Sequence, residues 1–257
     1  MKLDNNEPYH EGKDESGPGS ITYWHSTDNE EVYRKSIKDS ERLYYLQKMG
    51  WTDEKSIEYK LNNTGLRGDD FTLDPCVLTL GCSYTFGVGL PEYSTWPRLV
   101  ATSTKLKLAN LSWPGTSADT AYRMIRYWIK RLNVKLVCFL MPPAARFELI
   151  FDPLFRPSQF WWPVHTYMAP DLANNWQSND LVLNNWFGNE QNALLNQEKN
   201  LFAIKQICAE RKVPLLFEDS LFLAKREPHD WARDFVHAGP VIHKKLSEKF
   251  VNDWSNL

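Results

Sequence analysis

Residues 76–90 read CVLTLGCSYTFGVGL, an apolar run followed by a glycine-rich turn. Its first five residues form a short apolar run bounded by Pro75 and Gly81, which is typical of a buried strand. Ser83 follows in a glycine-rich turn. Since ligands bind at the carboxyl ends of strands in a parallel α/β fold, Ser83 has the position of a nucleophile. The turn reads G-x-S-x-T and lacks the second glycine of the G-x-S-x-G elbow.

Strand-like and helix-like segments alternate beyond this stretch. Further strands are expected at 106–111, 134–141 and 213–217, and helices at 96–105, 117–132, 190–211 and 239–254. This alternation implies right-handed crossovers and a parallel sheet between two layers of helices. The predicted fold class is therefore α/β, with three α/β/α layers spanning residues 76–257.

Residues 1–75 form a predicted N-terminal extension. Residues 1–20 are polar and have no apolar periodicity, so we expect a flexible tail there. Thr27-Asp-Asn-Glu30 has the spacing of a capping box and predicts a helix to about Met49, ended by Gly50. A second, shorter helix is expected over 53–61.

The segment 144–189 does not fit the alternation and is predicted to be an ordered insertion. It is too long for an ordinary loop and too aromatic for a disordered linker. Flat aromatic faces beside Asn and Gln suit sugar rings, and packing of the insertion onto the domain is an equally good interpretation. The candidate substrate-binding residues are Trp161, Trp162, Trp176 and Trp186.

A serine nucleophile needs a base and a group that orients the base. Asp234-Phe-Val-His237 precedes the last predicted helix, and two residues three apart in a turn can both face the site. His229-Asp230 competes, although adjacent side chains on an extended chain point apart. His243 falls inside the last predicted helix beside two lysines, so we expect it to be exposed to solvent.

These pieces together resemble the SGNH (GDSL-like) hydrolases. The Gly-x-Ser turn, the segment Asn110-Leu-Ser-Trp-Pro-Gly115 and the terminal Asp-x-x-His occur in that family in the same order. The upstream stretch Asn62-Asn-Thr-Gly-Leu-Arg-Gly68 resembles one found in bacterial and phage members. The resemblance implies a flavodoxin-like fold and acyl-ester chemistry without a metal. It implies Ser83 as nucleophile, His237 as base and Asp234 as its partner, with the N–H groups of Ser83 and Gly115 as oxyanion donors.

The chain departs from the family at two places. Cys82 stands where the family has Asp, and its thiol is an alternative nucleophile that the turn would aim elsewhere. The family's third block, Gly-x-Asn, is replaced by Leu140-Met-Pro-Pro-Ala-Ala-Arg146. Since proline offers no N–H, Arg146 is the candidate for the missing oxyanion donor, or for gripping a substrate carboxylate or pairing with an acid.

Composition excludes several other classes. The chain of 257 residues has a formal net charge of -2, which gives no electrostatic footprint for nucleic acid or an anionic membrane. No apolar run approaches the roughly 18 residues of a membrane span, and the polar start lacks the core of a signal peptide. We therefore expect a protein kept in the cytoplasm, or carried with a virion assembled there. The 4 cysteines show no CxxC pair, so neither a metal nor another cofactor is expected.

The sequence thus predicts a serine esterase that hydrolyses short acyl esters, acetyl-type ones included, on a saccharide or another small molecule. A non-catalytic saccharide-binding or virion-associated protein on a degenerate SGNH fold is one alternative. An acyltransferase that uses the same triad is the other. No partner among nucleic acids or membranes is expected, and the sequence indicates no oligomeric state.

Overall fold

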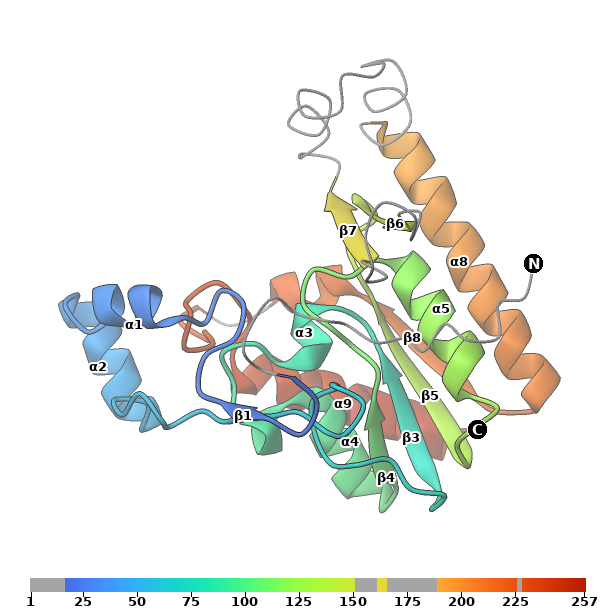
Figure 1. The fold of residues 1–257 in the computed structure, drawn as a ribbon, viewed down its shortest axis with the longest axis horizontal. Helices are drawn as coiled ribbons and strands as arrows, with labels where there is room; N and C mark the ends of the chain where they lie inside the picture. The colour runs from blue at the N-terminus through green and yellow to red at the C-terminus, as the bar shows by residue number, and fades with distance from the viewer. Residues whose placement is uncertain (1–16, 151–160, 166–188, 226–227) are drawn as a thin grey trace.

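The structure of the protein is a computed structural model, and it describes residues 17–150, 161–165, 189–225 and 228–257. A four-stranded sheet lies at the centre (Figure 1). Its strands run in the order β4 (Lys107–Asn110), β3 (Cys76–Leu80), β5 (Val134–Met141) and β8 (Leu215–Asp219). Each neighbouring pair is parallel. The predicted parallel sheet is therefore confirmed.

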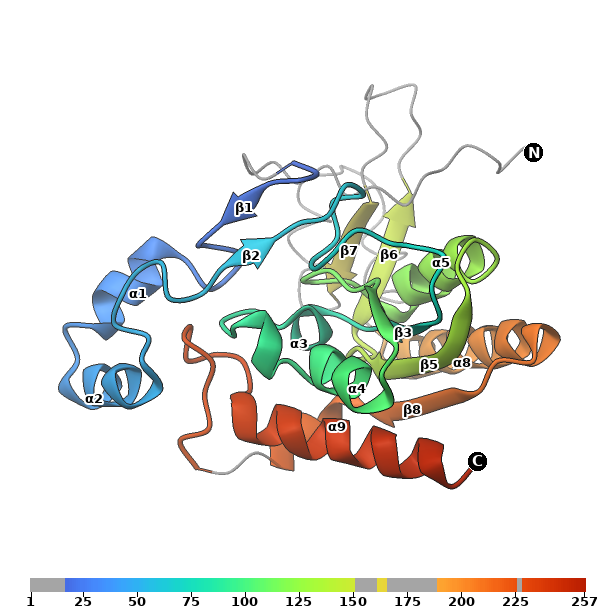
Figure 2. The same ribbon diagram turned by 90° about the horizontal axis from the view of Figure 1, so that it is seen from below.

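Helices cover both faces of this sheet (Figures 1 and 2). On one face lie α4 (Trp96–Thr104) and α9 (Pro240–Ser255), and on the other lie α5 (Ala118–Trp128) and α8 (Glu190–Arg211). Alternate residues of β3 supply the two cores, because successive side chains of a strand point to opposite faces. Leu78 packs with the α5 and α8 layer, whereas Val77 packs with the α4 and α9 layer. The predicted three-layer α/β/α fold is confirmed.

The N-terminal extension differs from its prediction. Two helices, α1 (Glu30–Ser36) and α2 (Ser40–Met49), replace the single one expected. The chain breaks between them because Asp39 caps α2, its carboxylate accepting the N–H groups of residues 41 and 42. Asn29, rather than Thr27, caps α1. Gly50 ends α2 in the left-handed conformation at φ 71°, as predicted.

The helix expected over 53–61 is wrong. The chain instead forms β2 (Tyr59–Lys60), which pairs antiparallel with β1 (Ile21–Thr22). Tyr59 is fully buried and its hydroxyl donates to Asp28 Oδ2 at 2.5 Å. A tertiary contact therefore overrides the weak local helix preference.

The extension and the α/β domain share a hydrophobic core. Side chains from residues 33–61 pack in it against Phe86, Val88, Leu90 and Ala232. Most of the tail predicted over 1–20 lies outside the described residues.

In the insertion, β6 (Arg146–Ile150) and β7 (Trp161–His165) form an antiparallel pair. None of the helices in the described ranges has the length and apolar character needed to cross a membrane.

Candidate active site

The turn that carries Ser83 follows β3 and opens the short helix α3 (Ser83–Phe86). Gly81 makes this turn possible, because its φ is +153°. A Cβ at Gly81 would lie 2.0 Å from Thr85 Oγ1 and 2.9 Å from the carbonyl oxygen of Leu140. The glycine thus lets the chain reverse tightly against β5 and present Ser83 at the carboxyl end of the sheet.

The structure brings the three predicted triad residues into one chain of hydrogen bonds. His237 Nε2 lies 2.8 Å from Ser83 Oγ, and His237 Nδ1 lies 2.6 Å from Asp234 Oδ2. All three residues are buried, with exposed fractions of 5% for Ser83, 7% for His237 and 2% for Asp234. The carboxylate beside Nδ1 favours a proton on that nitrogen, which leaves Nε2 free to accept the serine proton.

Asp234 is held from several sides. Its Oδ1 accepts the backbone N–H groups of Val236 and His237, each at 3.0 Å. Burial favours the neutral acid, but hydrogen bonds and charge from His237, with a further bond from Thr27, outweigh it and lower the pKa of Asp234. The carboxylate therefore stays ionised and can stabilise an imidazolium beside it.

The predicted oxyanion segment is tied to the serine turn by side-chain hydrogen bonds. The hydroxyl of Thr116 donates to the carbonyl oxygen of Gly81 at 3.1 Å. The side-chain amide of Asn110 donates to the carbonyl oxygen of Thr85 at 3.3 Å. Gly115 lies in this segment with φ +79°, a conformation that suits glycine.

Arg146 begins β6, and the structure describes no hydrogen bond between it and Ser83. Its Nη1 atom is buried and has no hydrogen-bond partner among the described residues. Its role as an oxyanion donor stays a prediction. Of the predicted substrate-binding residues, Trp161 and Trp162 lie in β7, and Trp176 and Trp186 lie outside the described residues.

The expectation for His243 is wrong. Its ring is buried with 1% exposure, and Nδ1 accepts the backbone N–H of Trp96 at 3.0 Å. Burial, with smaller contributions from the charges of His237 and Arg67, lowers the pKa of His243 to about 3. It faces inward because the buried face of α9, which also carries Ile242 and Leu246, includes this position.

The alternative pair His229-Asp230 and the alternative nucleophile Cys82 make no hydrogen bond to Ser83 or His237 within the described residues. Asp230 caps α9 by accepting the N–H groups of residues 241 and 242, and His229 is exposed near Glu41. Cys82 is buried with 1% exposure, and its thiol makes no hydrogen bond within the described part of the chain. Ser83, not Cys82, is hydrogen-bonded to His237.

A pocket beside the triad was not foreseen. It has a volume of about 400 Å³ and lies where residues on both sides of His237 meet the turn of Ser83. The ring of Tyr84 stands 5.0 Å from that of His237, measured between centroids. The walls are mainly apolar and consist of Tyr84, Pro143, Ser220, Leu221, Leu223, Val236 and Ala238.

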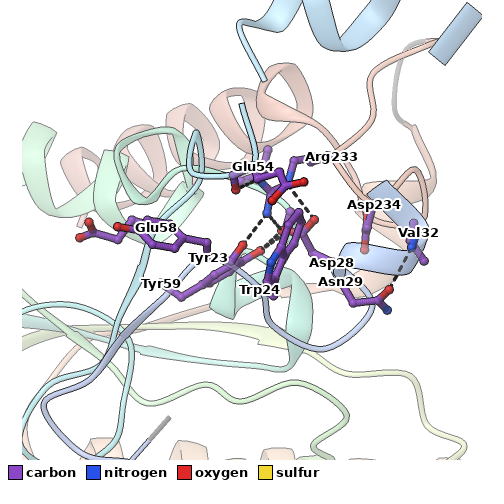
Figure 3. A network of polar contacts seen from close by, with 12 residues as sticks. Tyr23, Trp24, Asp28, Asn29, Val32, Glu54, Glu58, Tyr59, Arg233 and Asp234 are labelled. Carbon is purple, nitrogen blue, oxygen red and sulfur yellow. Dashed lines mark hydrogen bonds and ion pairs between the residues drawn. The ribbon is translucent and has the colours of Figure 1, made fainter. Parts of the chain in front are cut away.

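A buried ion pair joins the extension to the triad loop (Figure 3). Arg233 donates to both carboxylate oxygens of Asp28, at 2.9 and 2.8 Å. It also donates to the backbone carbonyl oxygens of Tyr23 and Glu54. Its guanidinium lies 4.4 Å from the ring centroid of Trp24. Sequence reasoning missed this network, because residues about two hundred positions apart show no local pattern.

In the described residues, no group of three or more His, Cys, Asp or Glu side chains is arranged to hold a metal ion.

Comparison with known proteins gives no match to a family model and none to a curated protein. A G-D-S-L family lipolytic protein from Veillonella parvula is 13% identical over 71% of this chain and 100% of its own, with a TM-score of 0.37. The esterase EstA from Pseudoalteromonas sp. is 14% identical over 71% and 99%, with a TM-score of 0.38. A family two carbohydrate esterase from Cellvibrio japonicus is 11% identical over 77% and 65%, with a TM-score of 0.38. The G-D-S-L proteins are the family that the sequence resembles. The fold described above is established by the strand order, and the geometry of the site by the hydrogen-bond distances.

Proposed function

We propose that this chain is a serine hydrolase that transfers the acyl group of an ester through an acyl-enzyme, with water as the acceptor. The observation that carries the proposal is the continuous chain Ser83–His237–Asp234, with atom separations of 2.8 and 2.6 Å. A serine in contact with a histidine that a buried carboxylate orients is the arrangement of an activated nucleophile.

In the proposed reaction Ser83 Oγ attacks the ester carbonyl while His237 Nε2 takes its proton. The imidazolium then gives that proton to the leaving alkoxide, and the acyl group stays on Ser83. Water attacks the acyl-enzyme with His237 again as base, which releases the acid and restores the serine. Asp234 remains ionised throughout and stabilises the imidazolium.

The oxyanion that forms twice in this cycle needs donors. The backbone N–H groups of Ser83 and Gly115 are the proposed ones, and Arg146 stays the candidate for a third. Loss of one such donor costs about 2.7–4 kcal/mol of transition-state stabilisation in serine hydrolases. A variant Arg146→Met that keeps its rate would remove Arg146 from the proposal.

The acyl group is proposed to occupy the apolar pocket beside His237. Its volume of about 400 Å³ is at the small end for ligand pockets, which favours short to medium acyl chains. Leu221, which is 71% exposed, stands at its wall. A saccharide as the alcohol part is proposed from the aromatic insertion alone.

Hydrolysis of p-nitrophenyl esters of increasing chain length tests both statements. We expect turnover that Ser83→Ala abolishes, with kcat/KM highest for short chains. Leu221→Trp should lower the rate for hexanoate more than that for acetate, because the larger ring fills the pocket. The control Val241→Trp, on the exposed face of α9, should change neither rate. A folded wild-type protein without turnover would favour the non-catalytic alternative, and product esters formed with added alcohols would favour an acyltransferase.

A further inference from the structure

Thr27 contacts the triad from the N-terminal extension. Its Oγ1 donates to Asp234 Oδ2 at 2.6 Å, across 207 positions of the sequence. The same oxygen lies 3.4 Å from His237 Nδ1. Thr27 does not cap α1 as expected, because Asn29 is the capping residue.

The turn that carries Thr27 is fixed on both sides. His25 and Asp28 exchange backbone hydrogen bonds of 2.8 and 3.1 Å, which close the turn around Thr27. Asp28 is paired with Arg233, the residue directly before Asp234. Although Thr27 itself lies at the surface, its hydroxyl is therefore presented to Asp234 by a buried ion pair rather than by a free loop.

The hydroxyl completes the hydrogen bonding of the Asp234 carboxylate. Oδ1 accepts two backbone N–H groups, and Oδ2 accepts Thr27 Oγ1 together with the proton on His237 Nδ1. A carboxylate has about four lone-pair sites, so these four donors hold it in one orientation. Hydrogen bonds to an ionised group are also shorter and stronger than neutral ones.

We infer that Thr27 is a positioning residue of the triad: its hydroxyl fixes Asp234 and withdraws charge from the oxygen that faces His237. The inference rests on the proposed function. Without this donor, Asp234 Oδ2 turns more easily and holds more negative charge against the imidazolium. The base then spends less time aligned with Ser83, and the carboxylate holds its imidazolium form more strongly.

The other groups near His237 do not replace this contact. Tyr84 packs its ring on that of His237, and the charge of His237 acts on the buried His243. The charge of Asp234 acts on Asp28, which Arg233 neutralises. Thr27 is the side chain from the extension that bonds directly to the triad carboxylate.

Three variants test the inference. Thr27→Val removes the hydroxyl and keeps the shape, and Thr27→Ser keeps the hydroxyl. Thr22→Val removes a hydroxyl that, among the described residues, bonds to Trp24 and not to the triad. For Thr27→Val we expect kcat to fall about tenfold, equivalent to about 1.4 kcal/mol, with little change in KM. We also expect the acid limb of the pH–rate profile to move to higher pH. Thr27→Ser should restore both, and Thr22→Val should match the wild type.

A second readout needs no turnover. We expect the proton between His237 Nδ1 and Asp234 Oδ2, which lie 2.6 Å apart, to give a low-field NMR resonance that moves in Thr27→Val and returns in Thr27→Ser. Unchanged kcat, pH profile and resonance in Thr27→Val would overturn the inference. An unchanged resonance would overturn it even if the wild type had no Ser83-dependent turnover. Absence of that turnover with the resonance moved by Thr27→Val would instead reject the proposed function and keep the positioning role.

Discussion

Removing Arg233 should test how firmly the extension holds the triad loop. The guanidinium is fully buried and bonds to both oxygens of Asp28 and to two backbone carbonyls. Arg233→Met would leave the Asp28 carboxylate buried without its cation. Breaking a buried pair in this way costs about 3–5 kcal/mol. For a chain of this size, that lowers the melting temperature by roughly 6–20 °C.

A double-mutant cycle separates the pair from the side-chain volume. Adding Asp28→Asn to Arg233→Met removes the uncompensated charge, so the double variant should lose about 2 kcal/mol less than the sum of the single losses. Urea unfolding followed by tryptophan fluorescence measures each free energy. Arg34→Met is the matched control, since its side chain is 58% exposed in an ion pair with Glu30, and it should cost less than about 1 kcal/mol.

The cycle has clear contrary results. A loss below about 1 kcal/mol for Arg233→Met would show that the pair does not stabilise the loop. Strict additivity of the two single variants would show that Arg233 and Asp28 act independently.

Three further predictions concern the same region. Burial, and to a smaller extent the charge of Arg67, lowers the pKa of His25 from 6.5 to about 4. The stability that the neutral His25 contributes is therefore lost as pH falls from 6.5 towards 4, so His25→Phe should flatten the plot of unfolding free energy against pH in that window. An unchanged slope would contradict this prediction. Gly81→Ala should cost at least about 2 kcal/mol and most activity, because its Cβ meets Thr85, and wild-type stability would refute the tight turn. Because the pKa of Asp234 is lowered in the folded protein, the stability that its carboxylate contributes is present above the unfolded pKa of 3.8 and is lost as pH falls through the folded pKa. The unfolding free energy of Asp234→Asn should lack this loss at acid pH. The same acid dependence in the variant and the wild type would count against the prediction.

The α/β domain was predictable because its signals are local. The buried strand at 76–80 is a short, mainly apolar run. The turn after it contains Gly81, whose positive φ is a conformation that favours glycine. The roles expected for Ser83, His237 and Asp234 come from the resemblance to the SGNH hydrolases. Since parallel strands and the loop before the last helix meet at one edge, the spatial meeting of Ser83 and His237 follows from the fold.

The tertiary contacts of the extension could not be predicted, because their signals are not local. Its contacts join residues far apart, as in Thr27 with Asp234 and Asp28 with Arg233, and neither charge nor hydroxyl pairs leave a periodic pattern. Local rules fail there in a consistent direction. Local spacing predicts a capping box at Thr27 and a helix at Tyr59, but each side chain makes a tertiary hydrogen bond instead.

Covalent labelling shows whether Ser83 is an activated nucleophile, whatever the substrate is. A fluorophosphonate probe should add to the wild type and to Cys82→Ala, with the adduct on Ser83 by peptide mass spectrometry. Ser83→Ala and His237→Gln should remain unlabelled while folding normally. Labelling that survives Ser83→Ala, or a folded wild type that never reacts, would show that Ser83 is not the activated nucleophile.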